Sequence, residues 1–168
     1  MATIRLAGVI RESIVDGPGI RFVVFAQGCP HHCPGCHNPT THDPAGGYDG
    51  DTDRLVEAFR QNPMLAGVTL SGGEPFLQPL PLARFARQIR QMGKTVITYT
   101  GYTLEYLMAH LEEHPGWRDL LVNTDRLVDG PFIAEQKSLQ LRFRGSANQR
   151  VLDPAASLAA GSVVEADF

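Results

Sequence analysis

The sequence predicts an α/β fold, an open partial barrel of strand and helix units around a largely parallel sheet. Apolar, β-branched strand patterns alternate along the chain with amphipathic helix patterns, which is typical of βαβ units. The 168 residues, 43% of them hydrophobic, suffice for one core but are too few for a closed eight-stranded barrel. We therefore expect a single domain over residues 1–153. The Ala- and Ser-rich residues 154–168 predict a loose C-terminal tail.

The individual elements follow from local patterns. β-branched and aromatic residues predict strands, and apolar residues at helical spacing predict helices that Gly or Pro ends. The predicted strands are Thr3–Ile10, Arg21–Ala26, Gly67–Leu70, Lys94–Thr100, Leu120–Asn123 and Leu127–Val128, with Gln140–Phe143 and Arg150–Leu152 as further candidates. The predicted helices are one capped by Asp51 or Thr52, one over Leu80–Met92 before Gly93, and one over Leu104–His114 before Pro115.

Charge and composition exclude several classes of function. The formal net charge is −3 and the sequence has no basic stripe, so we expect no nucleic-acid binding. The N-terminal segment Met1–Val9 is short and interrupted by Arg5, which predicts neither a signal peptide nor a membrane span. We therefore expect a cytoplasmic protein with reduced thiols.

The three cysteines of the chain form one cluster, Cys29, Cys33 and Cys36, directly after a predicted strand. An odd, tightly spaced set in a cytosolic chain indicates metal binding rather than disulfides. Thiolates suit iron–sulfur clusters, zinc or copper(I). Ferredoxin-type clusters use four cysteines, so a cubane held by three would leave one iron open, as catalysis requires.

A zinc site of three cysteines and one histidine is the main alternative on this segment alone. The nearby histidines are His31, His32, His37 and His42. Such a site would make the protein a zinc-stabilised interaction module without catalysis.

A second loop, Ser71–Pro75, follows the strand pattern Gly67–Leu70. Gly72 and Gly73 allow the backbone to approach a ligand closely, and exposed carbonyls with the Glu74 carboxylate suit an ammonium group. A plain strand-to-helix turn is the alternative. Because both loops follow strand C-termini, we expect them on the same rim of the sheet and around the same ligand.

These segments resemble the radical S-adenosyl-L-methionine (radical SAM) superfamily, through the three-cysteine loop and the later Gly72–Pro75. The segments Asp16–Arg21 and Gln27–Cys29 are similar to those of glycyl-radical-enzyme activases. Three further segments resemble the branch that activates anaerobic ribonucleoside-triphosphate reductase, and the likeness runs from about Gly8 to Asp153. These three are Tyr99–Thr103, Val128–Phe132 and Arg144–Arg150.

The resemblance implies an oxidoreductase with one 4Fe-4S cluster on Cys29, Cys33 and Cys36. The open iron would bind SAM, and reduction would cleave SAM to methionine and a 5′-deoxyadenosyl radical. That radical would take a hydrogen atom from a glycine of the large subunit of the reductase. The electron donor would be a small protein such as flavodoxin. The alternatives are an activase of pyruvate formate-lyase type and a radical SAM enzyme acting on a small molecule or peptide.

The resemblance also implies roles for particular residues. Gly72, Gly73 and Glu74 would hold the methionyl end of SAM. An aromatic residue commonly precedes the third cysteine, but here that position is Gly35, so backbone groups of Gly35, Cys36 and His37 are the candidates for contacting adenine. Thr100 is a candidate SAM contact, with strand packing or helix capping as the alternative.

Three other segments have two interpretations each. Asp16–Arg21 lines the entrance for the partner glycine or forms a turn locked by Pro18. Asp129–Phe132 belongs to the site or is a tight turn, and Arg144–Arg150 contacts the partner or closes a hairpin.

Overall fold

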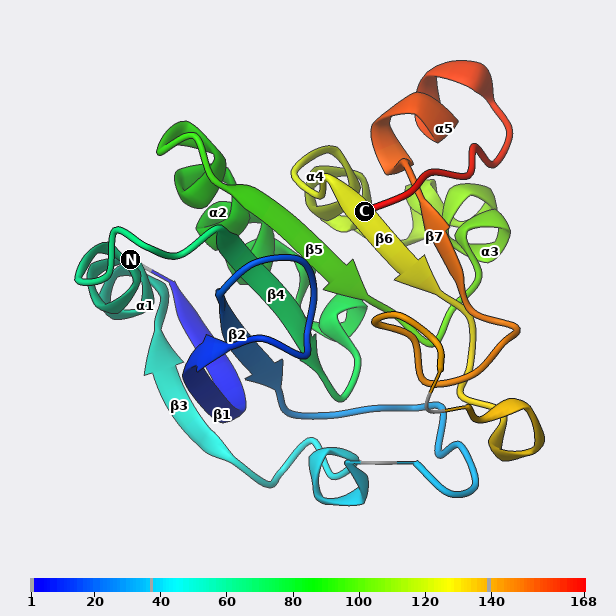
Figure 1. Cartoon of the computed structure of the whole chain (residues 1–168), viewed down its shortest axis with the longest axis horizontal. Coiled ribbons are helices and arrows are strands. Elements are labelled where there is room, and N and C mark those ends of the chain that lie inside the picture. The colour runs from blue at the N-terminus through cyan, green and yellow to red at the C-terminus, as the bar shows by residue number, and fades with distance from the viewer. Residues whose placement is uncertain (1, 37, 139) are drawn as a thin grey trace.

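The computed structural model describes residues 2–36, 38–138 and 140–168, which fold around one mixed sheet (Figure 1). Within these residues the sheet has seven strands in the order β3-β1-β2-β4-β5-β6-β7. The strands are β1 (Thr3–Ser13), β2 (Arg21–Ala26), β3 (Tyr48–Asp51), β4 (Gly67–Gly72), β5 (Thr95–Tyr99), β6 (Arg126–Asp129) and β7 (Arg150–Leu152). The α-helices are α1 (Thr52–Arg60), α2 (Pro79–Gln91), α3 (Leu104–Ala109), α4 (Trp117–Val122) and α5 (Pro154–Ala160). Short 3-10 segments cover Pro39–Thr41, Pro75–Leu77, Leu111–Glu113 and Ala134–Gln136.

The centre of the sheet is parallel and its edges are antiparallel. β2 pairs with β4, β4 with β5 and β5 with β6, all in parallel. β1 and β3 on one side, and β7 on the other, run antiparallel to their neighbours. The predicted α/β class with a largely parallel sheet is confirmed. Because β3 and β7 lie at opposite edges, the sheet stays open.

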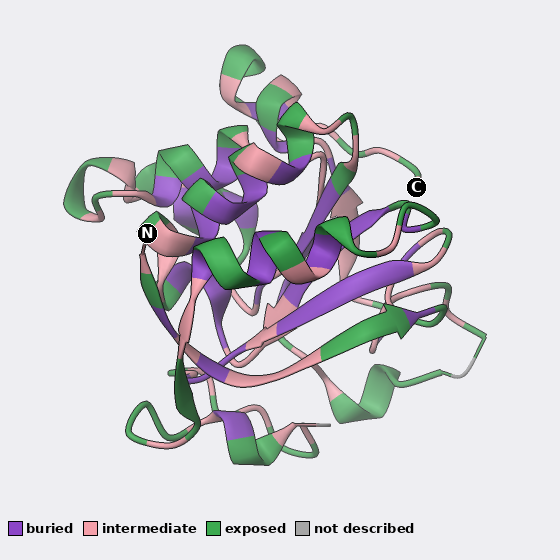
Figure 2. Cartoon of the chain, turned by 90° about the vertical axis from the view of Figure 1, so that its left-hand side faces the viewer, coloured by how far each residue is buried: buried purple, intermediate pink, exposed green. Residues whose placement is uncertain are grey.

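Helices cover one face of the sheet and form the core with it (Figure 2). Alternate residues of β2, Phe22 and Val24, face the helices and are fully buried. The Phe22 ring packs edge-on against Phe59 of α1 at 6.0 Å and tilted against Phe85 of α2 at 6.5 Å. The apolar stripe predicted on α2 is therefore core, as its helical spacing indicates.

The loop of residues 14–20 lies across the opposite face (Figure 1). Thr69 of β4 points to this face and donates its hydroxyl to the backbone oxygen of Asp16 at 2.7 Å. A Cβ on Gly17 would lie 2.6 Å from the Ile97 side chain of β5, and Gly17 has φ +139°, so only glycine suits this close approach. This loop therefore covers part of that face of the sheet.

Arg21, the last residue of the Asp16–Arg21 motif, is buried beneath this loop with 1% exposure. Its guanidinium donates to the backbone oxygens of Pro18 and Val68 and to the backbone and side chain of Thr95. Burial lowers the pKa of Arg21 to about 10, so the group stays charged at neutral pH. The end of the motif is thus a structural anchor.

Two predicted strands are wrong. Leu120–Asn123 was expected as a strand, but Trp117–Val122 is helix α4, which buries Trp117, Leu120 and Leu121 on one face. A short apolar run does not distinguish a buried strand from a buried helix. Gln140–Phe143 forms turns and bends, and Phe143 has φ +59°, which an extended strand excludes.

Smaller differences concern β3, α3 and the tail. Tyr48–Asp51 forms an edge strand that the sequence did not predict, and the helix predicted to reach His114 ends at Ala109. The tail expected to be loose contains α5, whose N-terminus is capped: the Ala156 N–H donates to the Asp153 carboxylate at 2.9 Å. Ser157 is fully buried, so tertiary contacts order a segment whose composition alone gives no strong signal. No helix among the described residues is long and apolar enough to cross a membrane.

Candidate active site

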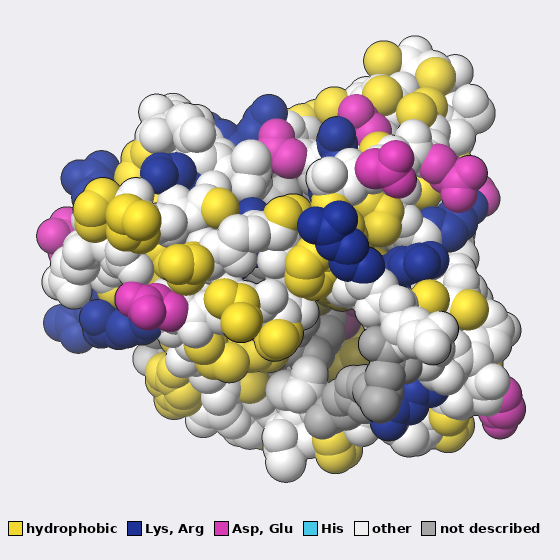
Figure 3. Space-filling model, in the orientation of Figure 1, with side chains coloured by type: hydrophobic (Ala, Val, Ile, Leu, Met, Phe, Trp, Pro, Cys, Tyr) yellow, Lys and Arg dark blue, Asp and Glu magenta, His cyan; other side chains and the backbone are white. Residues whose placement is uncertain are grey.

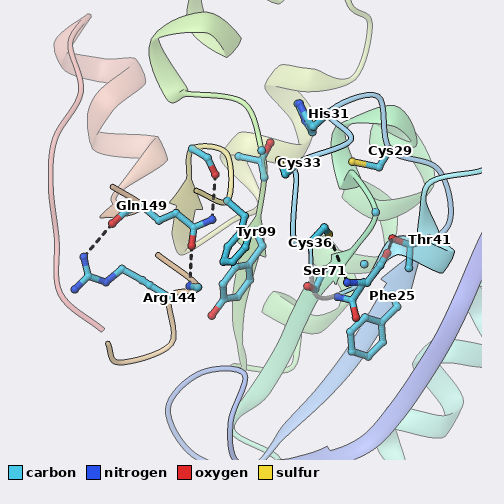
Figure 4. A pocket seen from close by; sticks show the side chains of 18 of the residues that line it. Phe25, Cys29, His31, Cys33, Cys36, Thr41, Ser71, Tyr99, Arg144 and Gln149 are labelled. Carbon is cyan, nitrogen blue, oxygen red and sulfur yellow. Dashed lines mark hydrogen bonds between the residues drawn. The ribbon is translucent and has the colours of Figure 1, made fainter. Parts of the chain in front are cut away.

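One cavity of about 350 Å³ opens at the C-terminal edge of the parallel strands. Its walls come from the cysteine loop, the ends of β4 and β5, the loop of residues 14–20 and the segments 130–132 and 141–149. Figure 3 shows the hollow on this face, and Figure 4 shows the side chains directed into it. The expected meeting of the cysteine loop and the glycine loop on one rim is therefore what the fold produces.

Backbone contacts fix the base of the cysteine loop. The Gly28 N–H donates to the Thr41 oxygen at 2.6 Å, and the Cys29 N–H donates to the His42 oxygen at 3.1 Å. The buried Gln27 amide reaches across the same loop and donates to the oxygens of Thr40 and Asp43. The loop therefore returns against its own start, and all three cysteines are half-buried and line the cavity.

The thiols differ in their surroundings. Burial raises the pKa of the Cys29 thiol, backbone N–H groups of His31 and His32 oppose this shift, and the Glu74 carboxylate adds to it. The Cys36 sulfur accepts a hydrogen bond from the Asn38 N–H at 3.4 Å. Metal binding requires thiolates, so loading of this loop releases protons.

The residues that line the cavity fit an iron–sulfur cluster, whose cysteine ligands bind different iron atoms and so lie apart from one another. The Nε2 atom of His42, another residue lining the cavity, is buried without a hydrogen-bond partner. A bound group with acceptor sulfurs would supply the partner that this nitrogen lacks. Among the described residues, no three His, Cys, Asp or Glu side chains converge as ligands of one metal ion would.

Gly72 and Gly73 both line the cavity, and the packing around them explains why both are glycine. Gly72 has φ +111°, and a Cβ there would lie 2.4 Å from the backbone nitrogen of Ala26. A Cβ on Gly73 would lie 2.2 Å from the Gly28 oxygen. The two glycines thus let the end of β4 lie directly against the base of the cysteine loop.

Glu74 lies beneath this wall. Its side chain is fully buried, and it is not among the residues that line the cavity. Its carboxylate accepts hydrogen bonds from the Thr100 hydroxyl at 2.9 Å and from the Gly101 N–H at 2.8 Å. It also accepts from the Phe76 N–H at 3.0 Å and meets His31 Nε2 at 2.6 Å. The carboxylate therefore ties protein segments together instead of projecting toward a ligand.

The remaining predicted site residues have different placements. Thr100 lines the cavity, but its hydroxyl is already bonded to Glu74. Cys36 lines the cavity, whereas Gly35 is exposed and outside the lining. His37 lies outside the described residues.

The segment Arg144–Arg150, expected either to contact the partner or to close a hairpin, forms part of the cavity wall (Figure 4). The Gln149 side chain accepts from the Gly145 N–H at 2.8 Å and donates to the Gly130 backbone oxygen at 3.1 Å. The Arg144 guanidinium donates to the backbone oxygen of Gln149 at 2.9 Å. This closed turn brings Gly130, Gly145 and Gln149 to the cavity.

Aromatic side chains also form part of the wall. Phe25, Tyr99, Phe132 and Phe143 line the cavity. Phe132 lies in the segment Asp129–Phe132, for which a site role was one of two interpretations, whereas Phe25, Tyr99 and Phe143 were not predicted as site residues. The signal available in the sequence was the alternation along β2 and β5, which turns Phe25 and Tyr99 away from the core helices.

Comparison with known proteins fits this geometry. The sequence model of the family described as "4Fe-4S single cluster domain" matches residues 15–152. This match defines the class of protein: a domain that carries a single 4Fe-4S cluster.

Individual relatives narrow the class. The anaerobic ribonucleoside-triphosphate reductase-activating protein of Vibrio cholerae is 34% identical over 145 residues, covering 81% of this chain and 89% of that protein. The protein of the same name from Escherichia coli K12 is 35% identical over 146 residues, covering 82% and 91%. The pyruvate formate-lyase-activating enzyme of Clostridium pasteurianum is 40% identical over 104 residues, which cover 58% of this chain and 44% of that enzyme. The chain belongs to the family of anaerobic ribonucleoside-triphosphate reductase-activating proteins.

Among solved structures, QueE from Escherichia coli superposes with a TM-score of 0.47 at 18% identity, covering 60% of this chain and 53% of that chain.

Proposed function

We propose that this protein is a radical SAM activase that generates a glycyl radical on an anaerobic ribonucleoside-triphosphate reductase. The observation that carries the proposal is that the three cysteines and the glycines Gly72 and Gly73 line the same cavity. Family membership and the names of the relatives support the same target.

In this proposal Cys29, Cys33 and Cys36 hold a 4Fe-4S cluster. Bound there, the cluster supplies the electron that cleaves SAM into methionine and a 5′-deoxyadenosyl radical. The cavity volume of about 350 Å³ suits a nucleotide-sized ligand. Thiolates of this loop leave the cluster one protein ligand short of the usual four, which gives SAM a place to bind.

The chain supplies binding and orientation. The backbone at Gly72 and Gly73 faces the cavity and is suited to the methionyl end of SAM, while the buried Glu74 holds that backbone in place. The aromatic rings of Phe132 and Tyr99, with the backbone at Cys36, offer apolar surface and polar groups for the adenosyl end. In this proposal a glycine loop of the reductase enters this cavity at the edge of the sheet.

The proposal includes a small protein such as flavodoxin as electron donor, and a cytoplasmic location where such donors occur. Neither binding to nucleic acid nor insertion in a membrane is part of it.

Anaerobic reconstitution with iron and sulfide tests this function. We expect iron and sulfide to bind, and 5′-deoxyadenosine to form from SAM after reduction. A glycyl radical should appear by electron paramagnetic resonance (EPR) when the reductase is added. Cys33→Ala should lose the cluster and all SAM cleavage, since two thiolates do not hold a cubane.

Two results would contradict the proposal. One is stoichiometric zinc in protein that is fully active. The other is a radical formed on pyruvate formate-lyase but not on the reductase, which would move this protein to the alternative target.

A further inference from the structure

His31, between Cys29 and Cys33, occupies a socket made by the other cavity wall. Its Nε2 atom lies 2.6 Å from Oε1 of Glu74, whose side chain is fully buried. The imidazole also packs edge-on against Tyr102, with ring centroids 4.5 Å apart. The His31 side chain itself is only 16% exposed. One residue of the cysteine loop is therefore held by a carboxylate of the glycine loop, 43 positions along the chain.

The socket is shaped for this ring. A Cβ on Gly101 would lie 2.4 Å from His31 Cδ2 and 2.7 Å from Nε2. Only glycine at position 101 leaves room for the imidazole, and the Gly101 N–H donates to the same Glu74 oxygen that His31 meets. The Thr100 hydroxyl fixes the carboxylate from a further side.

We propose that His31 is a positioning residue: its contact with Glu74, the His31–Glu74 latch, fixes the cysteine loop relative to the Gly72–Gly73 backbone. The expected effect on SAM binding rests on the proposed function, whereas the contact between His31 and Glu74 is a property of the chain alone. A bound SAM must reach both walls of the cavity, so its affinity depends on their relative placement. The groups assigned to the cluster and to the methionyl end of SAM on these walls, the cysteine thiols and the Gly72–Gly73 backbone, are carried by the two loops, so they move when the loops move.

Removing the latch should lower the affinity for SAM without lowering the cluster content, whereas removing a ligand cysteine should lower both. In His31→Ala all three cysteines remain, so we expect iron and sulfide contents like those of the native chain. We expect the affinity for SAM to fall about tenfold or more, the range seen when groups that orient the ligands of a metal site are removed. The change that SAM causes in the EPR spectrum of the reduced cluster should weaken accordingly.

Matched variants distinguish the latch from general damage. His31→Gln keeps a donor that can reach Glu74, so it should recover most of the affinity for SAM. His110→Asn is the matched control, because it removes a His–Glu contact of 2.9 Å, to Glu113, that involves no residue lining the cavity. It should bind SAM as the native chain does.

A double-mutant cycle tests the socket from its other side. Gly101→Ala should expel the imidazole and reproduce the loss seen in His31→Ala. The double variant should then be no weaker than His31→Ala alone, since the added Cβ has no ring left to displace. Additive losses of SAM affinity would mean that Gly101 acts on the ligand directly, and the cycle would then contradict the latch.

Hydrogen exchange of the full, metal-free chain makes the latch testable without SAM chemistry. His31→Ala should raise exchange in residues 29–36 compared with the native chain and with His110→Asn. Native-like exchange together with native SAM affinity in His31→Ala would overturn the inference, as would His31→Gln behaving no better than His31→Ala. If the latch protects the loop but reconstituted protein cleaves no SAM, the proposed function fails while the latch stands.

Discussion

Arg150 of β7 holds the buried carboxylate of Asp129 at the end of β6 with two hydrogen bonds, of 3.0 and 2.6 Å. Asp129 is 1% exposed and also accepts the N–H of Leu104 at the start of α3. The same guanidinium reaches the exposed Glu105. The pair thus joins the edge strand, α3 and the loop that begins at Gly130 beside the cavity.

Arg150→Met should destabilise the chain by about 3 kcal/mol, because it leaves the Asp129 carboxylate buried without its cation. Glu105→Gln is the matched control: it removes only the exposed partner of Arg150 and should cost less than about 1 kcal/mol. Urea unfolding of the metal-free chain measures both. Equal losses of unfolding free energy in the two variants would contradict the view that Arg150 stabilises the chain mainly through Asp129.

Tyr99 should resist ionisation at high pH. Burial raises its pKa well above the ordinary value, with the Asp16 charge adding to the shift, and its hydroxyl donates to the Phe143 backbone oxygen. Above pH about 10 the unfolded chain loses this proton while the folded chain keeps it, so stability conferred by neutral Tyr99 is present below that pH and falls as pH rises.

Spectrophotometric titration of the native chain and of Tyr99→Phe measures ionisation of the Tyr99 hydroxyl. The difference between the two titration curves should show no phenolate from Tyr99 near pH 10 while the chain stays folded. The free energy of unfolding of the native chain, compared with that of Tyr99→Phe, should fall as the pH is raised further. A phenolate that titrates at the ordinary value would show that the hydroxyl is solvated.

Much of the site could be predicted because its main determinants are local. Cys29, Cys33 and Cys36 lie on one loop after β2, and Gly72 and Gly73 follow β4, so parallel pairing alone brings the two loops to the same edge. The strand–helix alternation that predicts this pairing is a property of short windows, and it holds for β2, β4, β5 and α2.

The details that could not be predicted depend on partners far apart in the chain. The expected role of Glu74 as a direct ligand group followed from its charge, but burial between His31 and Thr100 is set by three loops meeting. The helix at Leu120 and Leu121 likewise depends on Trp117, whose indole N–H donates to the Phe76 oxygen 41 positions away. No pattern within a window of the sequence carries these relationships.

Arg21→Lys should cost about 1–3 kcal/mol, because an ammonium group cannot replace a guanidinium that donates to acceptors on three different segments. Exchange in residues 14–20 should rise as the loop loses its anchor at Pro18. Arg11→Lys is the control: Arg11 is exposed and bonded only weakly, at 3.3 Å to Gln61, so its change should stay within about 0.5 kcal/mol. Indistinguishable unfolding curves for the two variants would show that the buried guanidinium is not an anchor.

Gly73→Ala tests whether the glycine loop acts through its closeness to the cysteine loop. The added Cβ would lie 2.2 Å from the Gly28 oxygen and 2.9 Å from the Thr41 oxygen, and both are backbone atoms that cannot rotate away. The base of the cysteine loop must therefore move, and we expect SAM cleavage by reconstituted protein to fall roughly a hundredfold, as displacements of about 1 Å do in active sites. Gly8→Ala is the control, because a Cβ there meets nothing within 4 Å and should leave cleavage unchanged. If Gly73→Ala cleaves SAM at the native rate, the two loops tolerate separation, and the close packing at Gly28 serves the fold without serving the reaction.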